Sequence, residues 1–311
     1  MYVFLLKMDM KVHILGCGSA KPTTRHQPSS QLLELHGKYY MIDCGEGVQV
    51  MMQRLGLAML KVGHIFISHN HGDHVFGLPG LISTMSLLGR TSQLHIHGPQ
   101  DVEPLVRLTL DVYCQGIEYE VLFHPVRARE HYVVYQDRSV TVESIPLDHR
   151  VECCGYLFRE AQSLPHIRRE MIDAFSIPVS QINNIKMGAG WTTTDGTFLP
   201  HERLTTPAAP AKSYAYCSDT RFKPQIAEIV RGVNLLYHEA TFTHDGLDRA
   251  SKTMHSTSVQ AATVAELAHV GQLVIGHYSA RISDEQILLD EAKKVFENTV
   301  LAYEGQKIVV F

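Results

Sequence analysis

The sequence predicts a layered α/β fold, and three observations lead to this prediction. Short apolar runs alternate with amphipathic stretches along the whole of the 311 residues. The apolar runs fall into two groups, with helical patterns between them and outside them, and no internal repeat is visible. Several of these runs end directly before a histidine or an aspartate. Such a pattern favours sheets covered by helices over a sandwich of strands or a bundle of helices.

The first group of apolar runs predicts strands at residues 12–15, 31–35, 38–42, 65–67 and 94–97. Gly37 and Lys38 predict a hairpin turn between the second and third of these strands. Amphipathic stretches at 47–55 and 77–88 predict helices. The strand at 65–67 matters most for function, because a histidine-rich segment follows it directly.

The second group predicts strands at residues 140–145, 154–158, 213–217, 235–237 and 273–275. The clearest late helices are expected at 258–269 and 284–296, where the apolar spacing is near 3.6 residues. Ser258 and Asp284 are plausible N-terminal caps for these two helices. Three of the strands in this group also end close to a candidate metal ligand.

The alternation of predicted strands and helices is interrupted from about residue 159 to residue 212. This stretch contains five prolines and the segment TTTDG at 192–196. It lies between two candidate ligands, His149 and Asp219. We therefore predict a single domain spanning residues 1–311, with an inserted arm at about 159–212 that projects from it. The alternative is a surface insertion that has no function of its own.

The composition is ordinary for a soluble globular protein. Apolar residues make up 45% of the chain, charged residues make up 19%, and the formal net charge is −4. A slightly acidic protein has no general attraction for nucleic acid, so RNA binding requires a local basic patch. No apolar run approaches the ~20 residues of a membrane-spanning helix, and we expect no membrane association.

The N-terminal residues and the cysteines favour a cytoplasmic location. The first residues lack the basic region and the small-residue cleavage site of a secretory signal. Met8 and Met10 precede the first patterned segment, so Met1, Met8 and Met10 are alternative starts. The six cysteines form no CxxC pair and several lie in apolar runs, which predicts reduced and mostly buried thiols.

Residues 68–74 read SHNHGDH and directly follow the apolar strand at 65–67. Imidazole nitrogen and carboxylate oxygen are donors that zinc-class metals accept, and the segment contains no thiolate. It therefore predicts an open catalytic metal site rather than a closed structural one. The alternative is a polar turn that is rich in histidine. The predicted ligands from this segment are His69, His71, Asp73 and His74.

Further ligands are expected where other strands end. His149, Asp219 and His277 each follow an apolar strand. Open α/β sheets gather their ligands at the edge formed by the carboxyl ends of the strands, so these three are expected beside the first four. His97 and Asp148 are weaker candidates. A further ten histidines are expected to be structural or surface residues: His13, His36, His64, His95, His124, His131, His166, His201, His244 and His269.

Two more segments indicate a proton donor. His238 and Glu239 follow the strand at 235–237, and His255 precedes the helix at 258–269. A histidine near a helix N-terminus, oriented by a glutamate, can act as a general acid or contact a phosphate. The structural alternative for residues 256–258 is a helix cap.

Together these residues resemble the ribonuclease Z family, which comprises tRNA 3′-processing endonucleases of the metallo-β-lactamase superfamily. The resemblance covers nearly the whole chain from Val12 onward. The HxHxDH motif at 69–74 is shared by the whole superfamily and indicates fold and metal only. The narrower motifs are LGCGSAKP at 15–22, SDTR at 218–221, HEAT at 238–241, HST at 255–257 and GHYSAR at 276–281.

The resemblance implies a four-layered αββα sandwich with an inserted projecting arm, and two zinc ions per chain. By this resemblance one zinc is held by His69, His71 and His149, the other by Asp73, His74 and His277, and Asp219 bridges both. Asp73 is expected to take or orient the proton of the nucleophile. His255, steadied by Glu239, is expected to donate a proton to the leaving 3′ oxygen.

The implied reaction removes the 3′ trailer from precursor tRNA, leaving a 3′-hydroxyl on the tRNA and a 5′-phosphate on the trailer. The resemblance also implies a homodimer. In many family members the arm carries a Gly-Pro-rich tip that grips the tRNA body. Here residues 176–188 read SIPVSQINNIKMG, without that tip, and the basic residues of the arm are nearly balanced by acidic ones.

Two alternatives remain open at this point. One is a general zinc phosphodiesterase that acts on small diesters or cyclic nucleotides. The other is a metal-dependent RNA-binding protein with little turnover, which an intact ligand set and an acid candidate disfavour. A thioesterase or lactamase is more distant, because the segments at 238–241 and 255–257 would then have no role.

Overall fold

The computed structural model describes residues 10–311, so Met1 and Met8 as alternative starts lie outside the described residues. The chain divides into two compact units: residues up to 159 together with 212–311, and residues 160–211. Between residues 10 and 311, none of the helices has the length and apolar character needed to span a bilayer. All six cysteines are buried and free, as their spacing predicted.

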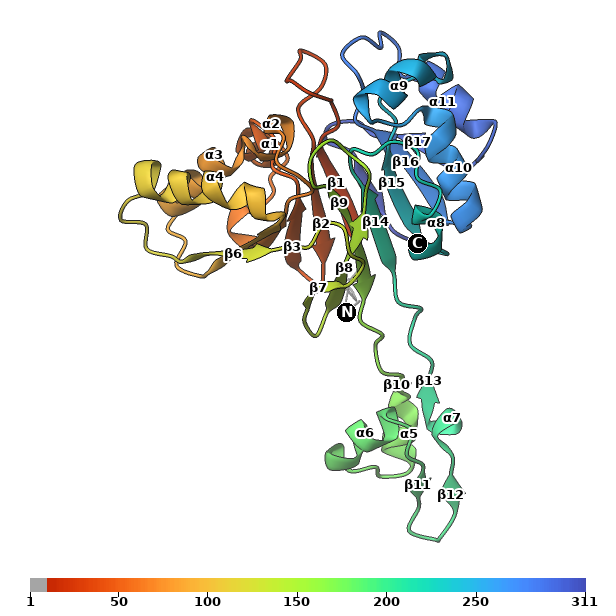
Figure 1. Cartoon of the computed structure of the whole chain (residues 1–311). Helices are drawn as coiled ribbons and strands as arrows, with labels where there is room; N and C mark the ends of the chain where they lie inside the picture. The colour runs from red at the N-terminus through yellow and green to blue at the C-terminus, as the bar shows by residue number, and fades with distance from the viewer. Residues whose placement is uncertain (1–9) are drawn as a thin grey trace. The chain divides into compact units, whose positions relative to one another are not determined.

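The first unit contains two seven-stranded sheets (Figure 1). The first sheet has the order β18-β1-β2-β3-β4-β5-β6, with antiparallel pairing from β18 to β3 and parallel pairing from β3 to β6. Its strands are β1 (Lys11–Gly16), β2 (Ser30–Leu35), β3 (Lys38–Ile42), β4 (Val62–Phe66), β5 (Leu94–Gly98), β6 (Val121–Pro125) and β18 (Lys307–Val309). The parallel strands bring their carboxyl ends to one edge, where the segment that follows β4 lies.

A two-residue turn joins β2 and β3. Leu35 pairs with Lys38, so the turn residues are His36 and Gly37, whose φ angles are 50° and 78°. Two positive φ angles match the right-handed twist of a tight hairpin and favour glycine at the second position. The predicted hairpin is confirmed, but its turn lies one residue earlier than predicted, because Lys38 already pairs within β3.

The second sheet has the order β17-β16-β15-β14-β9-β8-β7. Strands β14 to β17 are parallel, whereas β9 runs antiparallel to β14 and β7 runs antiparallel to β8. Its strands are β7 (Val133–Gln136), β8 (Val140–Pro146), β9 (Cys154–Glu160), β14 (Ser213–Cys217), β15 (Leu235–Glu239), β16 (Gln272–Gly276) and β17 (Thr299–Leu301). The ends of β8, β14, β15 and β16 deliver the remaining candidate site residues.

The alternation of side chains along the strands produces four layers. In β3, Tyr40 and Ile42 belong to the core between the sheets, whereas Tyr39 and Met41 pack under the first helix layer. The helices are α1 (Val48–Arg54), α2 (Gly72–Val75), α3 (Leu78–Leu87), α4 (Glu103–Leu108), α8 (Ile226–Ile229), α9 (Leu247–Thr253), α10 (Ser258–Ala268) and α11 (Gln286–Lys293). Single turns or short irregular helices occupy Met59–Lys61, Gln100–Val102, Thr109–Tyr113 and His244–Gly246. The order helix, sheet, sheet, helix confirms the αββα sandwich.

The helix termini correct the predicted caps. The cap of α10 is Thr257 rather than Ser258: its side chain accepts a hydrogen bond from the N–H of Gln260, whose side chain accepts one from the N–H of Thr257. Asp284 lies one residue outside the cap of α11 and accepts from the N–H of Gln286. Strands β6, β7, β17 and β18 were not predicted, because they are short and, apart from Val121 and a few other residues, only half-buried.

The second unit has a small core of its own. It contains β10 (His166–Ile167), α5 (Arg169–Ala174), α6 (Val179–Lys186), β11 (Trp191–Thr192), β12 (Phe198–Leu199), α7 (His201–Leu204) and β13 (Thr205–Thr206). Strand β10 pairs with β13, and β11 pairs with β12. Its buried apolar side chains are those of Ile177, Ile185, Leu199 and Leu204.

Candidate metal centre

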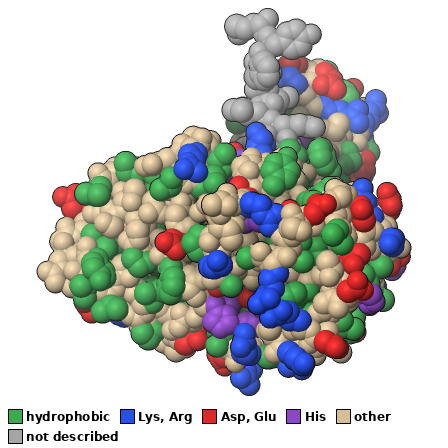
Figure 2. Space-filling model, turned by 90° about the horizontal axis from the view of Figure 1, so that it is seen from above, with side chains coloured by type: hydrophobic (Ala, Val, Ile, Leu, Met, Phe, Trp, Pro, Cys, Tyr) green, Lys and Arg blue, Asp and Glu red, His purple; other side chains and the backbone are tan. Residues whose placement is uncertain are grey.

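The seven predicted ligands come together where strands of both sheets end. His69, His71, Asp73 and His74 follow β4 of the first sheet, and His149, Asp219 and His277 follow β8, β14 and β16 of the second. The segment after β4 turns sharply, because α2 starts at Gly72 with His71 as its N-terminal flanking residue. Figure 2 looks at this end of the unit and shows histidine side chains among lysine and arginine side chains.

The first group of donor atoms comes from His69, His71, His149 and Asp219, and all of them lie within 4.8 Å of one another. Nδ1 of His71 lies 3.0 Å from Nε2 of His69 and 3.3 Å from Nε2 of His149. Oδ2 of Asp219 lies 3.6 Å from Nε2 of His69 and 3.8 Å from Nε2 of His149. Three imidazole nitrogens and one carboxylate oxygen therefore point at a common position.

The second group comes from Asp73, His74 and His277. Oδ2 of Asp73 lies 3.5 Å from Nε2 of each of the two histidines. The other oxygen of Asp219, Oδ1, lies 3.4 Å from Nε2 of His74 and 3.2 Å from Nε2 of His277. Asp219 thus directs one oxygen toward each group.

The donor set fits divalent cations. Nε2 of His74, Nε2 of His277 and Oδ1 of Asp219 are buried and have no hydrogen-bond partner in the described part of the chain. A buried polar atom without a partner costs free energy, and a cation between these atoms would satisfy all three at once. Nitrogen and oxygen donors without sulfur are typical of catalytic zinc-class sites.

The opposite side of four of the five imidazoles is held by a hydrogen bond. Nδ1 of His74 contacts Oδ2 of Asp43 at 2.7 Å, and Nδ1 of His69 contacts Oγ of Ser68 at 3.0 Å. Nδ1 of His149 donates to the carbonyl of Met254 at 2.9 Å, and Nδ1 of His277 contacts Oγ1 of Thr241 at 2.9 Å. Such contacts fix the ring orientation and leave Nε2 to face a metal.

Asp43 is the principal residue that sequence reasoning missed. It is fully buried and accepts hydrogen bonds from the hydroxyl groups of Ser68 and Tyr216, at 2.9 and 2.7 Å. Burial lowers the pKa of His74, but the carboxylates of Asp43, Asp73 and Asp219 outweigh burial and raise it to about 10. These three carboxylates therefore favour a positive charge at the position of His74. Asp43 directly follows β3, so the rule that identified Asp219 after its strand could have identified Asp43 too.

His255 and Glu239 lie together beside the two groups. Nδ1 of His255 lies 3.0 Å from Oε1 of Glu239 and 3.9 Å from Oδ2 of Asp219. Glu239 is fully buried and also accepts backbone N–H groups of Thr220 and Ser256 at 3.0 Å. Burial lowers the pKa of His255, but the charges of Glu239 and Asp219 outweigh burial and raise it to about 9. The glutamate therefore has no free rotation and fixes the imidazole.

The weaker candidates lie elsewhere. His97 stacks on Phe66 and His124, and its Nε2 contacts Nδ1 of His64 at 3.1 Å. Asp148 forms an ion pair with Arg221 at 3.2 Å. His238 is buried, and its Nδ1 contacts the carbonyl of Glu239.

A cluster that the sequence did not indicate is formed by Cys17, His26 and Glu304, whose donor atoms also lie within 4.8 Å of one another. These three are already hydrogen-bonded. Nδ1 of His26 contacts Glu304 at 3.1 Å, and the thiol of Cys17 contacts the same carboxylate at 3.5 Å. Because no donor atom of the cluster is left without a partner, its role is to hold the segment between β1 and β2.

Two ribonuclease Z proteins are similar to the chain over nearly its whole length. A ribonuclease Z from Parabacteroides distasonis is 52% identical over 97% of this chain and 99% of its own length. A ribonuclease Z from Bacteroides fragilis is 53% identical over 95% of this chain and 97% of its own length. The family described as "Anti-Pycsar protein Apyc1" matches residues 10–160.

Two solved structures show the same fold. Human tRNase Z, short form, has a TM-score of 0.70 at 22% identity, covering 97% of this chain and 100% of that chain. The metallo-β-lactamase fold protein YhfI from Bacillus subtilis has a TM-score of 0.67 at 20% identity, covering 97% of this chain and 99% of that chain. At these sequence identities the structural similarity supports the fold alone.

Proposed function

The chain belongs to the ribonuclease Z family and is a tRNA 3′-processing endoribonuclease, and we propose that it works with two zinc ions per chain. The cleavage removes the 3′ trailer from precursor tRNA, leaving a 3′-hydroxyl on the tRNA and a 5′-phosphate on the trailer. The observation that carries the proposal is the pair His255 and Glu239 beside two groups of donor atoms that share Asp219. Incubation with a 3′-extended precursor tRNA, with the ends of both products mapped, tests it.

We assign one zinc to His69, His71 and His149, the other to Asp73, His74 and His277, and Asp219 to both. These residues would hold divalent cations, which would supply positive charge to the phosphoryl oxygens and a water activated at neutral pH. The two separately directed oxygens of Asp219 support a shared ligand. The three buried atoms without partners support the presence of charge between them.

The proton transfers are assigned to side chains around the centre. Oδ2 of Asp73 accepts the N–H of Ala20, in the segment after β1, at 2.6 Å, which fixes the carboxylate beside the donor atoms. We assign to Asp73 the role of taking or orienting the proton of the attacking water. Nδ1 of His255 is occupied by Glu239, so its Nε2 is the atom left to donate a proton to the departing 3′ oxygen. In this assignment Glu239 is a positioning residue, and Asp73 and His255 are catalytic.

Residues 160–211 are assigned to substrate binding as an inserted arm. They form a compact unit with their own core and contain none of the seven ligands. Arg169 and Arg203 are exposed on this unit and can contact phosphates. The arm is proposed to hold the tRNA body rather than to take part in the chemistry.

A homodimer is also proposed, and an exposed apolar surface on α3 and the helical segment 103–113 supports it. Leu87 is 86% exposed and Tyr113 is 71% exposed, and both line the same shallow hollow. Leu88, Leu108 and Val112 on the same elements are also about half exposed or more. Large apolar side chains gathered on one surface are typical of a protein interface. A cytoplasmic location is proposed from the six buried free thiols.

A further inference from the structure

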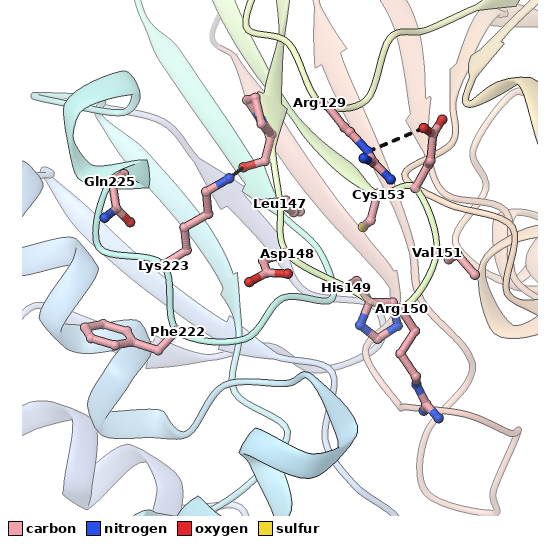
Figure 3. A pocket seen from close by; sticks show the side chains of 12 residues that line it. Arg129, Leu147, Asp148, His149, Arg150, Val151, Cys153, Phe222, Lys223 and Gln225 are labelled. Atoms are coloured by element: carbon pink, nitrogen blue, oxygen red, sulfur yellow. Dashed lines mark hydrogen bonds and ion pairs between the residues drawn. The ribbon is translucent and has the colours of Figure 1, made fainter.

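A cavity of about 700 Å³ lies beside His149 (Figure 3). Its walls are the loop of residues 146–153 between β8 and β9, the loop of residues 222–225 after β14, and Arg129. Cavities of several hundred Å³ are of the size that holds a nucleotide-sized ligand. Because His149 also belongs to the first group of donor atoms, the cavity shares a wall with the metal centre.

Three cations and two carboxylates line the cavity. The carboxylates are already paired, since Glu152 lies 3.5 Å from Arg129 and Asp148 lies 3.2 Å from Arg221. Arg221 is not part of the lining, so its charge compensates Asp148 from outside. The remaining charge of the lining is therefore positive and resides on Arg150 and Lys223.

Arg150 and Lys223 form no ion pair with any carboxylate among residues 10–311. Nζ of Lys223 donates to the carbonyl of Pro146 at 2.8 Å, which is a neutral acceptor, and the other two N–H groups of the ammonium stay available. Lys223 is half-buried and Arg150 is exposed, directly after the candidate ligand His149. In Figure 3 the Arg150 side chain extends past His149, and Lys223 lies across the cavity from Arg129.

Two cations without counter-ions in a cavity next to a phosphodiesterase centre attract an anion. We propose that this cavity holds the RNA backbone immediately next to the scissile bond, and that Arg150 and Lys223 bind its phosphate groups. The inference rests on the proposed function and adds a binding site to it. The ligand chemistry is a single-stranded nucleotide phosphate, whose source is either the trailer or the 3′ end of the tRNA.

The first test compares Arg150→Gln and Lys223→Gln with Arg138→Gln as a matched control. Arg138 is exposed in the turn before β8, at the opposite end of that strand from the cavity. Each cavity variant is expected to raise the half-saturating concentration of precursor tRNA on the order of tenfold, since a charged hydrogen bond is lost. The slope of log affinity against log salt should fall by about 0.7 for each lost single-strand phosphate contact. Arg138→Gln should change neither quantity, and Lys223→Arg, which keeps the charge, should recover most of the affinity.

The second test identifies the source of the phosphate. Precursor tRNAs are prepared with one neutral methylphosphonate linkage, placed either on the trailer side or on the tRNA side of the cleavage site. One of these linkages should lower the affinity of the unaltered enzyme for precursor tRNA but cause no further loss of affinity in Arg150→Gln. That linkage marks the phosphate that Arg150 contacts. Additive losses at every linkage, on both sides, would overturn the proposal.

The outcomes separate this inference from the proposed function. Both cavity variants could still cleave precursor tRNA with unchanged half-saturating concentrations and salt slopes. That result would overturn the proposed role of the cavity alone. An unaltered enzyme that hydrolyses bis(p-nitrophenyl) phosphate but does not cleave precursor tRNA would overturn the proposed function instead. A loss on precursor tRNA at least tenfold larger than the loss on the small diester supports the cavity as an RNA site.

Discussion

The backbone N–H of Ala20 donates a hydrogen bond to Oδ2 of Asp73, with the two atoms 2.6 Å apart. Ala20 has a φ of 67°, in the left-handed region that non-glycine residues rarely adopt, so the surrounding contacts must hold it. The N–H of Ser19 donates to the carbonyl of Tyr278, and the N–H of Tyr278 donates to the carbonyl of Cys17. The segment after β1 is thereby joined to Asp73 and to the neighbour of His277.

Asp73 is held by several contacts. Its replacement and the replacement of His255 should have different consequences for metal content and activity. Asp73→Ala removes a candidate ligand and a proton acceptor together. We expect activity to fall on every substrate, and the metal content, measured by elemental analysis, to fall with it. Full metal content with full activity in this variant would contradict both roles of Asp73.

His255→Ala should keep its metal and slow cleavage of precursor tRNA by ~10²–10⁴-fold, the usual size of general acid catalysis. The loss should shrink for a nitrophenyl phosphodiester, because nitrophenolate leaves without needing a proton. His244→Ala, which removes an exposed histidine before α9, is the control and should behave as the unaltered enzyme. Equal losses on good and poor leaving groups would count against the acid role.

The candidate site could be predicted largely because strand ends are visible in the sequence. A histidine or aspartate directly after an apolar run identified His149, Asp219 and His277, and the structure brings all three to the segment at 69–74. The same rule would have identified Asp43. Glu304 could not be found in this way, since its contacts with Cys17 and His26 connect residues 287 and 278 positions apart.

The second prediction concerns the number of metal ions. The seven candidate ligands form two groups, and Asp219 directs one oxygen toward each. One zinc ion cannot use seven ligands. Protein prepared without added metal should approach two equivalents per chain by elemental analysis. Asp219→Ala should bring the content below one equivalent, because both groups lose a donor. A content of one equivalent with full activity would contradict the two-metal assignment.

The third prediction concerns the dimer. Light scattering at micromolar concentration should give twice the chain mass. Leu87→Glu combined with Tyr113→Ala should shift the protein toward the monomer, because a charge would be buried in the proposed interface. The matched control is Leu267→Glu, at a position on α10 that is 48% exposed. A monomer mass for the unaltered protein would refute the dimer.

The fourth prediction is a loss of stability in mild acid that originates in the stacked rings of His64, His95, His97 and His124 on β4, β5 and β6. Burial, together with the nearby charge of His95, lowers the pKa of His64 from 6.5 to about 4, and burial lowers that of His97 further. The unfolded chain therefore binds more protons than the folded chain between about pH 6.5 and 4, so stability falls as the pH falls through this range. Above pH 6.5 this contribution is fully present.

His64→Phe keeps an aromatic ring in the stack and removes the titrating group. Its thermal midpoint should fall less steeply between pH 7 and pH 4 than that of the unaltered protein, even if the midpoint at pH 7 is lower. Exposed His244→Phe should leave the slope unchanged. Identical slopes for all three proteins would show that the stack does not govern the response to acid.

The last prediction separates tRNA processing from general diester hydrolysis. Residues 160–211 form a unit with its own core between β9 and β14, and none of the seven candidate ligands lies in it. Replacing about residues 168–202 by a short Gly/Ser linker should therefore leave the fold of the first unit and its hydrolysis of a small phosphodiester in place. The same deletion should greatly raise the concentration of precursor tRNA needed for cleavage and flatten its salt dependence, because phosphate contacts from the arm are lost. If precursor tRNA is processed as before, the arm has no part in substrate binding, and affinity for tRNA must reside in the first unit alone.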